Sequence, residues 1–207
     1  MVLVVAEKPS VARSIRKAIS GDFKAVALSG HILDVDFPRE YESWWKTNPK
    51  DLFNAPVRWV VRDRKAYREL VEALREHGDL IVLATDNDHE GELIAYEVLL
   101  IARDVLGKAR YARMRFNSTT PRELKKAWEN LEPDLNWGWV WKAQFRRMFD
   151  LVTGAAYTRL LTTSARRAGE DVKLISWGSC QTPTLWFVSE REKQIKEFKP
   201  QTYYTIE

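Results

Sequence analysis

The chain has 207 residues, 45% of them hydrophobic and 30% charged, and a formal net charge of +4. This length and composition are typical of a globular protein with one large domain, or one domain and part of another, and exclude a disordered or fibrous chain. No apolar run approaches the roughly 20 residues that span a bilayer, and no basic segment precedes the first short apolar run, so neither membrane insertion nor secretion is expected. The one cysteine, Cys180, excludes an internal disulfide and a cysteine metal cluster and fits a reducing cytoplasm.

Charge is divided unevenly between the two halves. Residues 1–100 hold 14 basic and 17 acidic side chains, whereas residues 101–207 hold 19 basic and 12 acidic ones. A basic half is typical of a protein that binds a polyanion, and clustered carboxylates in the other half can hold a divalent cation. An ordinary solvated charged surface is the alternative, and charge alone does not choose between the two.

The predicted elements of the first half alternate between strands and helices. Residues 2–6 form a β-branched run without alternation, typical of a parallel strand buried on both faces, and residues 11–19 have the apolar spacing of a helix. The same order of strand, loop and helix recurs at residues 80–84 and 93–105. Other predicted elements are strands at 25–28, 57–61 and 109–116 and a helix at 65–77; none is predicted for 31–56. The alternation predicts an α/β domain with a mostly parallel sheet flanked by helices.

The second half is predicted to be an α-helical segment. Thr120-Pro121-Arg122-Glu123 is a capping box with proline at the first helical position, and it starts a helix through residue 131. Further helices are predicted at about 137–165 and 183–195. In the first of these, Trp137, Trp141 and Phe145 recur at helical spacing and are predicted to be core residues. Residues 203–206 resemble the beginning of a strand, and a strand without a partner is expected where a sequence stops within a longer protein.

Acidic residues follow two predicted strands directly. Glu7 comes after residues 2–6, and Asp86, Asp88 and Glu90 come after residues 80–84. Ligands of open parallel sheets bind outside the carboxyl ends of the strands, so these four carboxylates are expected in one crevice. Such a cluster suits Mg²⁺, a hard cation that takes oxygen ligands and phosphate oxygens together. The alternative is that the two aspartates are loop or N-cap residues.

Lys8 is adjacent to Glu7 and adds a positive charge to the same predicted crevice. The ammonium group is suited to contact a scissile phosphate, and a Glu7 carboxyl whose pKa is raised by the other acids is suited to protonate a leaving hydroxyl. Both roles belong to phosphodiester chemistry. A solvated Glu-Lys pair is the alternative.

Five segments of the chain carry a family resemblance: AEKPS at 6–10, GH at 30–31, ATDNDHEGE at 84–92, FNSTTP at 116–121 and ISWGSCQTPTL at 175–185. Together they resemble the type IA DNA topoisomerases, most closely the topoisomerase III branch. An Asp-x-Asp-x-Glu motif is weakly specific, because primases, type II topoisomerases and some nucleases share the Toprim fold that carries it, whereas the last segment is much more specific.

The resemblance implies a domain organisation. Residues 1–117 are expected to form a Toprim domain, which is Rossmann-like, and residues 118–200 part of the helical domain that binds single-stranded DNA. Residues 201–207 are expected to begin a further, truncated domain.

The resemblance also implies a mechanism and roles for individual residues. Asp86, Asp88 and Glu90 would hold Mg²⁺ together with Glu7, which acts near the leaving 3′ oxygen, while Lys8 contacts the scissile phosphate. A tyrosine attacks one DNA strand and becomes linked to its 5′ phosphate, and another strand passes before religation, without ATP.

Three residues of the helical half match the single-strand groove of the family. Arg146 and Asp150 match an Arg-x-x-x-Asp motif, and Gln181 matches a polar contact to DNA. The alternatives are an intrahelical ion pair for the first two and a polar residue at a helix end for the third.

Two departures from the family pattern bear on activity. His89 stands where many relatives have arginine, and none of the seven tyrosines lies in a segment that matches the nucleophile, which is expected beyond Tyr203. The chain alone is therefore expected to lack cleavage activity. Two alternatives remain: a stand-alone module, or half of a split enzyme, that binds Mg²⁺ and single-stranded DNA; and a Toprim nuclease that uses a metal-activated water.

The resemblance also implies partners and a location. The expected partners are DNA, chiefly single-stranded or underwound, and the rest of the enzyme or a separate chain that bears the tyrosine, with no membrane. If the source is prokaryotic, the expected location is the cytoplasm, in association with the nucleoid.

Overall fold

The computed structural model describes residues 1–206, which form two compact units. The first unit comprises residues 1–36 and 57–148, and the second comprises residues 37–56 and the chain from residue 149 onward. These units differ from the predicted segments 1–117, 118–200 and 201–207, because residues 118–148 pack with the first unit and residues 37–56 pack with the second. As domains of an enzyme, the three segments remain a prediction.

A four-stranded parallel sheet lies at the centre of the first unit. Its strand order is β2-β1-β5-β6, and each strand is parallel to its neighbours. The strands are β1 (Val2–Ala6), β2 (Phe23–Ala27), β5 (Leu80–Ala84) and β6 (Tyr111–Arg113). The predicted parallel α/β sheet is confirmed.

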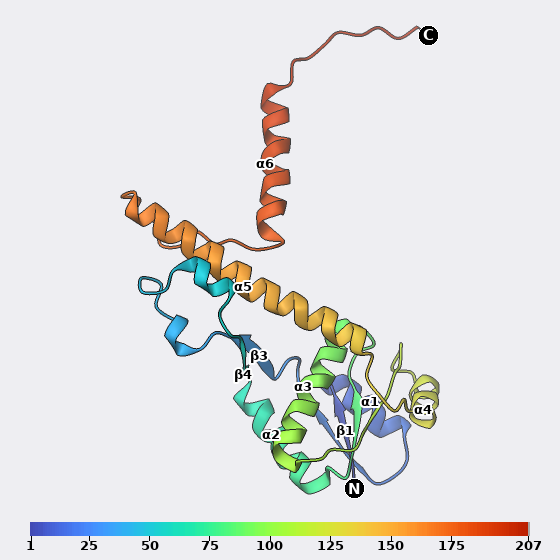
Figure 1. The fold of residues 1–207 in the computed structure, drawn as a ribbon. Coiled ribbons are helices and arrows are strands. Elements are labelled where there is room, and N and C mark those ends of the chain that lie inside the picture. Colours follow the sequence, from blue (N-terminus) through green and yellow to red (C-terminus); the bar gives the residue numbers. More distant parts are fainter. Residues whose placement is uncertain (207) are drawn as a thin grey trace. The chain divides into compact units, whose positions relative to one another are not determined.

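Helices cover both faces of this sheet (Figure 1). Side chains of α1 (Pro9–Ala18) and α4 (Pro121–Glu129) pack in one core cluster, and those of α2 (Arg64–His77) and α3 (His89–Leu106) pack in another. Successive residues of β1 alternate between the clusters: Val4 belongs to the first, and Leu3 to the second. Both faces of the strand are therefore buried, which explains its continuous apolar sequence.

A second, antiparallel sheet consists of β3 (Leu33–Asp36) and β4 (Arg58–Val61). The sequence predicted β4 as one more strand of the alternating α/β pattern, but it pairs only with β3 and lies outside the parallel sheet. Residues 31–56, for which no element was predicted, contain β3 and two 3₁₀ turns, Arg39–Tyr41 and Pro49–Phe53.

Two helices account for most of the chain after residue 136. Helix α5 (Trp137–Arg167) begins in the first unit and continues into the second, and α6 (Gln181–Glu197) lies wholly in the second. The extended segment between them is tied to α5 by threonine hydroxyls: the Ile175 N–H donates to Thr162 Oγ1 at 3.0 Å, and the Trp177 N–H to Thr158 Oγ1 at 2.9 Å.

Two sequence predictions for this half are wrong. Residues 203–206 form no strand, because no other strand of residues 1–206 lies beside them. Trp141 and Phe145 are 53% and 70% exposed instead of buried, because helical spacing shows that side chains share a face but not that something covers it. No helix within residues 1–206 combines the length and the apolar composition needed to cross a membrane.

Candidate functional site

The carboxyl ends of β1 and β5 bring Glu7, Lys8 and Asp86 together. The two strands are neighbours in register, with Ala6 opposite Ala84, so the residues that follow them lie at the same edge of the sheet. The Lys8 ammonium donates to Asp86 Oδ2 at 2.5 Å, and the Asp86 backbone N–H donates to Glu7 Oε2 at 3.4 Å.

Burial or neighbouring charges raise the pKa of two of these three groups, Glu7 and Lys8. The Glu7 side chain is 15% exposed, and desolvation raises its pKa, with a second contribution from the negative charge of Asp86. The hydrogen bond to Asp86 raises the pKa of Lys8, whose side chain is 54% exposed. The site therefore presents a carboxyl that holds its proton more tightly than usual beside a firmly charged ammonium.

The loop between β5 and α3 turns tightly around Gly91. Asp88 is the N-cap residue of α3, and its Oδ1 accepts the Gly91 N–H at 2.7 Å, which is the role that the alternative interpretation gave it. The Asp86 side chain takes no part in this cap and instead accepts the hydrogen bond from Lys8. A Cβ on Gly91 would lie 2.1 Å from the backbone oxygen of Asp86, so this loop conformation requires glycine.

Glu90, on the first turn of α3, contacts basic groups. Its carboxylate oxygens lie 3.2 Å from His31 Nε2, 3.7 Å from His89 Nε2 and 3.9 Å from Arg146 Nη1. Within residues 1–206 no three acidic, histidine or cysteine side chains are gathered so as to hold a metal ion as they lie. The four predicted metal ligands are thus divided between the environment of Lys8 and that of His31.

Sequence reasoning assigned no role to Glu97, which organises the surroundings of Glu90. Glu97 is completely buried and accepts hydrogen bonds from the Ile32 and Leu33 N–H groups, both at 3.0 Å. Arg147 Nη1 donates to it at 2.9 Å, and His31 Nδ1 lies 2.7 Å away. His31 therefore lies between Glu97 and Glu90. The sequence feature that could have indicated this role is an acidic residue among the apolar residues of the helix predicted at 93–105.

Arg113 is a second charged residue whose role was not foreseen. It is completely buried in β6, and its Nε donates to Glu92 at 3.0 Å. Its Nη2 donates to the Asp86 carbonyl at 2.9 Å, and its Nη1 to three other carbonyls. Arg115 donates to the same Glu92 oxygen at 2.6 Å. Arg113 thus fixes the backbone of the loop that presents Asp86.

A crevice of about 350 Å³ opens beside Lys8 and Asp86. Its other wall is formed by Asn87 and residues 116–119, part of one of the segments that carry the family resemblance. Asn87 Nδ2 donates to Asn117 Oδ1 at 2.8 Å and so links the loop after β5 to residues 116–119. Lys8 and Asp86 are therefore accessible to a ligand that enters this crevice.

The three predicted DNA-binding residues belong to different units. Arg146, in the first unit, lies within 3.9 Å of Glu90. In the second unit, Asp150 accepts a hydrogen bond from the Ser179 hydroxyl at 2.5 Å, and Gln181 is the first residue of α6, with its carboxamide oxygen against Gly178.

Comparison with known proteins assigns the family. The Toprim domain profile matches residues 2–119, and the DNA topoisomerase profile matches residues 134–207. The chain belongs to the type IA DNA topoisomerases. It is 33% identical to DNA topoisomerase 1 of Archaeoglobus fulgidus over 99% of this chain and 33% of that protein. It is 36% identical to DNA topoisomerase 3-beta of Oryza sativa subsp. japonica over 99% of this chain and 27% of that protein.

A solved structure agrees with this assignment. Full-length topoisomerase I from Thermotoga maritima superposes with a TM-score of 0.66 and 25% identity, covering 96% of this chain and 31% of that one. The predicted Toprim fold followed by a helical segment is confirmed. The chain spans about a quarter to a third of the length of these relatives.

Toprim domains of topoisomerases are generally metal-binding, commonly with Mg²⁺, and the donor set of this chain fits such an ion. Glu7, Asp86 and Asp88 offer only oxygen atoms and follow adjacent strands, which suits a hard cation. The negative charges of Asp86 and Asp88 both raise the pKa of Glu7, so the carboxylates repel one another in the absence of a cation, even beside Lys8.

Proposed function

We propose that this chain supplies the metal- and phosphate-binding part of a type IA DNA topoisomerase. The enzyme would cleave one DNA strand through a 5′-phosphotyrosine, pass another strand and religate the first, without ATP. The tyrosine would come from the rest of the enzyme or from a separate chain. The observation that carries the proposal is the contact between Lys8 and Asp86 beside the largely buried Glu7, at the mouth of an accessible crevice.

Lys8 is suited to hold the scissile phosphate. Asp86 fixes its ammonium at one edge of the crevice while the side chain stays 54% exposed. A phosphate that enters the crevice meets a fixed positive charge, which stabilises the negative charge that develops on phosphate oxygens.

Glu7 is suited to move the proton of the leaving oxygen. It lies beside Lys8, with its Oε1 3.9 Å from the ammonium, and burial raises the pKa of its carboxyl. A carboxyl of raised pKa donates a proton to the 3′ oxygen during cleavage and accepts it during religation.

Asp86, Asp88 and Glu90, together with Glu7, are the residues that would hold Mg²⁺. Bound there, the ion would neutralise and orient the DNA phosphate. Because these side chains form no ready three-ligand group, we expect phosphate oxygens and water to complete the coordination.

A paired assay tests this proposal on the 207-residue chain. Supercoiled and single-stranded DNA are incubated with and without Mg²⁺, and both relaxation and covalent protein-DNA adducts are measured. We expect neither, with binding to single strands retained. An adduct would place the nucleophile among the seven tyrosines, and Mg²⁺-dependent free ends without an adduct would identify a nuclease; either result overturns the proposal.

The metal assignment has its own test. The double variant Asp86→Asn/Asp88→Asn is expected to lose at least about tenfold in Mg²⁺ affinity by calorimetry with a bound oligonucleotide, because it removes two anionic ligands. The variant Asp22→Asn/Asp104→Asn removes the same charge at exposed positions and serves as the control. Equal affinities of the two variants would refute the assignment.

The single-strand groove is tested at Arg146. Arg146→Ala is expected to weaken binding to oligo-deoxythymidine and to reduce the slope of log K against log salt by about 0.7, the value for one lost phosphate contact on a single strand. Arg75→Ala, an exposed position on α2, is the control. An unchanged slope would return Arg146 to a structural role as a partner of Glu90.

A further inference from the structure

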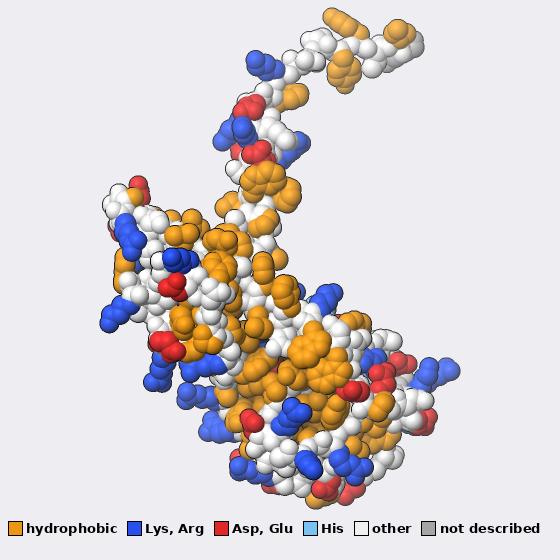
Figure 2. All heavy atoms as spheres, in the orientation of Figure 1, with side chains coloured by type: hydrophobic (Ala, Val, Ile, Leu, Met, Phe, Trp, Pro, Cys, Tyr) orange, Lys and Arg blue, Asp and Glu red, His pale blue; other side chains and the backbone are white. Residues whose placement is uncertain are grey.

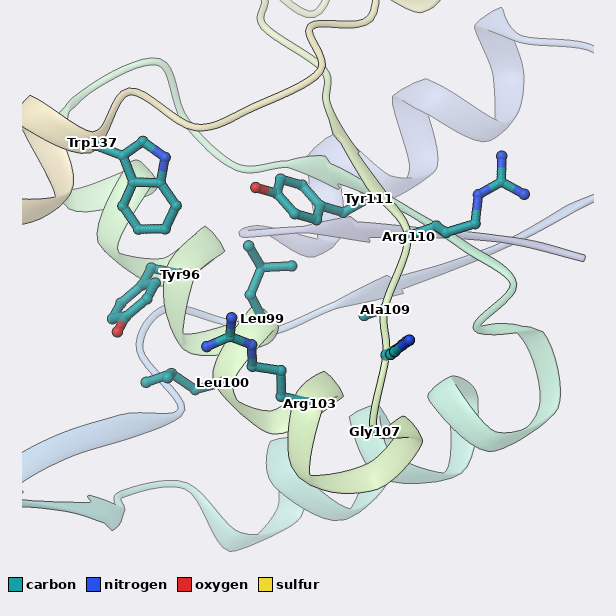
Figure 3. A pocket seen from close by; sticks show the side chains of 10 residues that line it. Tyr96, Leu99, Leu100, Arg103, Gly107, Ala109, Arg110, Tyr111 and Trp137 are labelled. Carbon is teal, nitrogen blue, oxygen red and sulfur yellow. The ribbon is translucent and has the colours of Figure 1, made fainter.

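Figure 3 shows a cavity of about 490 Å³ beside the first residue of β6, whereas the candidate site follows the last residues of β1 and β5. It is formed by the part of α3 from Tyr96 to Arg103, the loop at residues 107–110, and the first residues of β6 and α5, Tyr111 and Trp137. Glu90, in the first turn of α3, precedes the first lining residue of this helix, Tyr96, by six residues, or about 9 Å along the helix axis. The volume lies within the roughly 300–1,000 Å³ of small-molecule sites.

Three aromatic rings line this cavity, and two of them are fixed by one carboxylate. Asp134 accepts the Tyr111 hydroxyl at 2.6 Å and the Trp137 Nε1–H at 3.1 Å. Tyr96 packs edge-on against Trp137, with 5.8 Å between the ring centroids. The rings are therefore held in place without a ligand, which reduces the entropy that binding would cost.

Basic side chains complete the lining. Arg103 and Arg110 contribute guanidinium groups and Lys108 an ammonium group. In Figure 3 the Arg103 side chain reaches towards the ring of Tyr96, whereas Arg110 points away from the rings. Arg103 and Lys108 are exposed, so an anion can reach them from solvent.

We propose that this cavity binds a nucleotide, with the base against the aromatic rings and the phosphate on Arg103 and Lys108. Flat rings stack on a nucleobase with little dependence on its identity, and guanidinium and ammonium groups bind phosphate. Uncharged apolar molecules would leave the cations unused, and a phosphate alone would leave the rings unused. The nucleotide is either a free molecule or one residue of a nucleic-acid strand.

Photocrosslinking gives a readout that is local to the cavity. The chain is irradiated with 5-iododeoxyuridine monophosphate, or with oligo-deoxythymidine that carries one 5-iododeoxyuridine, and the modified peptides are identified by mass spectrometry. We expect crosslinks at Tyr96, Tyr111 or Trp137. Inorganic phosphate and unphosphorylated deoxyuridine, used as competitors, are each expected to compete more weakly than the intact nucleotide.

Charge variants test whether the cations hold the phosphate. Arg103→Gln/Lys108→Gln is expected to reduce crosslinking and affinity by about tenfold or more, because two charge-assisted contacts are lost. Lys125→Gln/Lys126→Gln, which removes the same charge from exposed positions on α4, is the control. The proposal does not depend on the topoisomerase function, so Asp86→Asn/Asp88→Asn should leave the crosslinks intact.

The source of the nucleotide follows from which probe reacts. Crosslinking by the monophosphate identifies a free-nucleotide site, and crosslinking by the oligonucleotide alone identifies a contact with a strand; both support the proposal. If neither probe modifies these rings, or if the charge variant and the control crosslink equally, the proposal is wrong.

Discussion

Arg113 is a buried cation whose side chain makes five hydrogen bonds to other groups of the protein. Its guanidinium contacts the fully buried Glu92 and four backbone carbonyls, one of them that of Asp86. Burial is the largest influence on its pKa and lowers it, while the charge of Glu92 opposes the shift. A buried ion pair of this kind contributes little net stability compared with apolar residues of the same size. Removing one partner is nevertheless strongly destabilising, because the other charge stays buried without compensation.

We therefore expect Arg113→Ala to lower the free energy of unfolding by about 3–5 kcal/mol, because it leaves Glu92 and several carbonyls buried without this partner. Urea unfolding followed by circular dichroism measures the change. Arg122→Ala, at an exposed position on α4, should stay within about 0.5 kcal/mol of the parent chain. A loss below about 1 kcal/mol for Arg113→Ala would show that water or Arg115 replaces its contacts.

The residues of the candidate site differ in how far the sequence could predict them. Glu7, Lys8 and Asp86 each follow a predicted strand closely, so the rule that ligands bind at strand carboxyl ends was enough to place them together. The contact between His31 and Glu97 joins residues 66 positions apart, and no local pattern encodes it.

At the scale of elements, the turn from β5 into α3 depends on one small residue. A Cβ at Gly91 would collide with the backbone of Asp86. The Cβ position lies 2.1 Å from the carbonyl oxygen of Asp86 and 2.8 Å from its carbonyl carbon. Backbone atoms cannot move aside like the end of a flexible side chain. Any side chain at this position must therefore displace Asp86 or the start of the helix.

Gly91→Ala is accordingly expected to cost about 1–3 kcal/mol of unfolding free energy, as for other overpacked sites, and to weaken Mg²⁺ binding by moving Asp86. Gly138→Ala is the matched control, because its nearest neighbour, Asn136 Oδ1, is 3.4 Å from the Cβ position and alanine favours a helix by up to about 1 kcal/mol. Thermal unfolding and calorimetry of both variants check the prediction. If Gly91→Ala behaves like Gly138→Ala, the loop is more adaptable than its geometry indicates.

Elements with strong local patterns were predicted, and those defined by distant partners were not. The strands at residues 2–6 and 80–84 agree with β1 and β5, because a continuous apolar run indicates a strand buried on both faces. β3 is four residues long and half of it is aspartate, so only its pairing with β4 makes it a strand. The strand predicted at residues 57–61 corresponds to β4, the partner of β3, but the sequence did not predict that it belongs to a separate antiparallel sheet.

For the molecule as a whole, buried apolar side chains are distributed unequally between the two units. Both core clusters consist of residues of the first unit alone. Helix α6 of the second unit, by contrast, buries no side chain within residues 1–206, and Leu185, Trp186 and Phe187 are 58–68% exposed. Figure 2 shows hydrophobic side chains at the surface of this helix. Most helical stability comes from packing of an apolar face, which α6 lacks here.

Hydrogen exchange should therefore separate α6 from a helix of nearly the same length. Helix α3 has 18 residues, ten of them buried, whereas α6 has 17 residues and none buried. An isolated helix of this length is only marginally stable in water, so α6 amides are expected to exchange through local opening while α3 amides exchange only through opening of the core. Mass spectrometry of deuterium uptake by the 207-residue chain compares the two directly, with peptides of β1 and β5 as the protected reference. Protection of α6 equal to that of α3 at low protein concentration would mean that α6 is covered in solution; protection that appears only as concentration rises would mean that its apolar residues bring copies of the chain together.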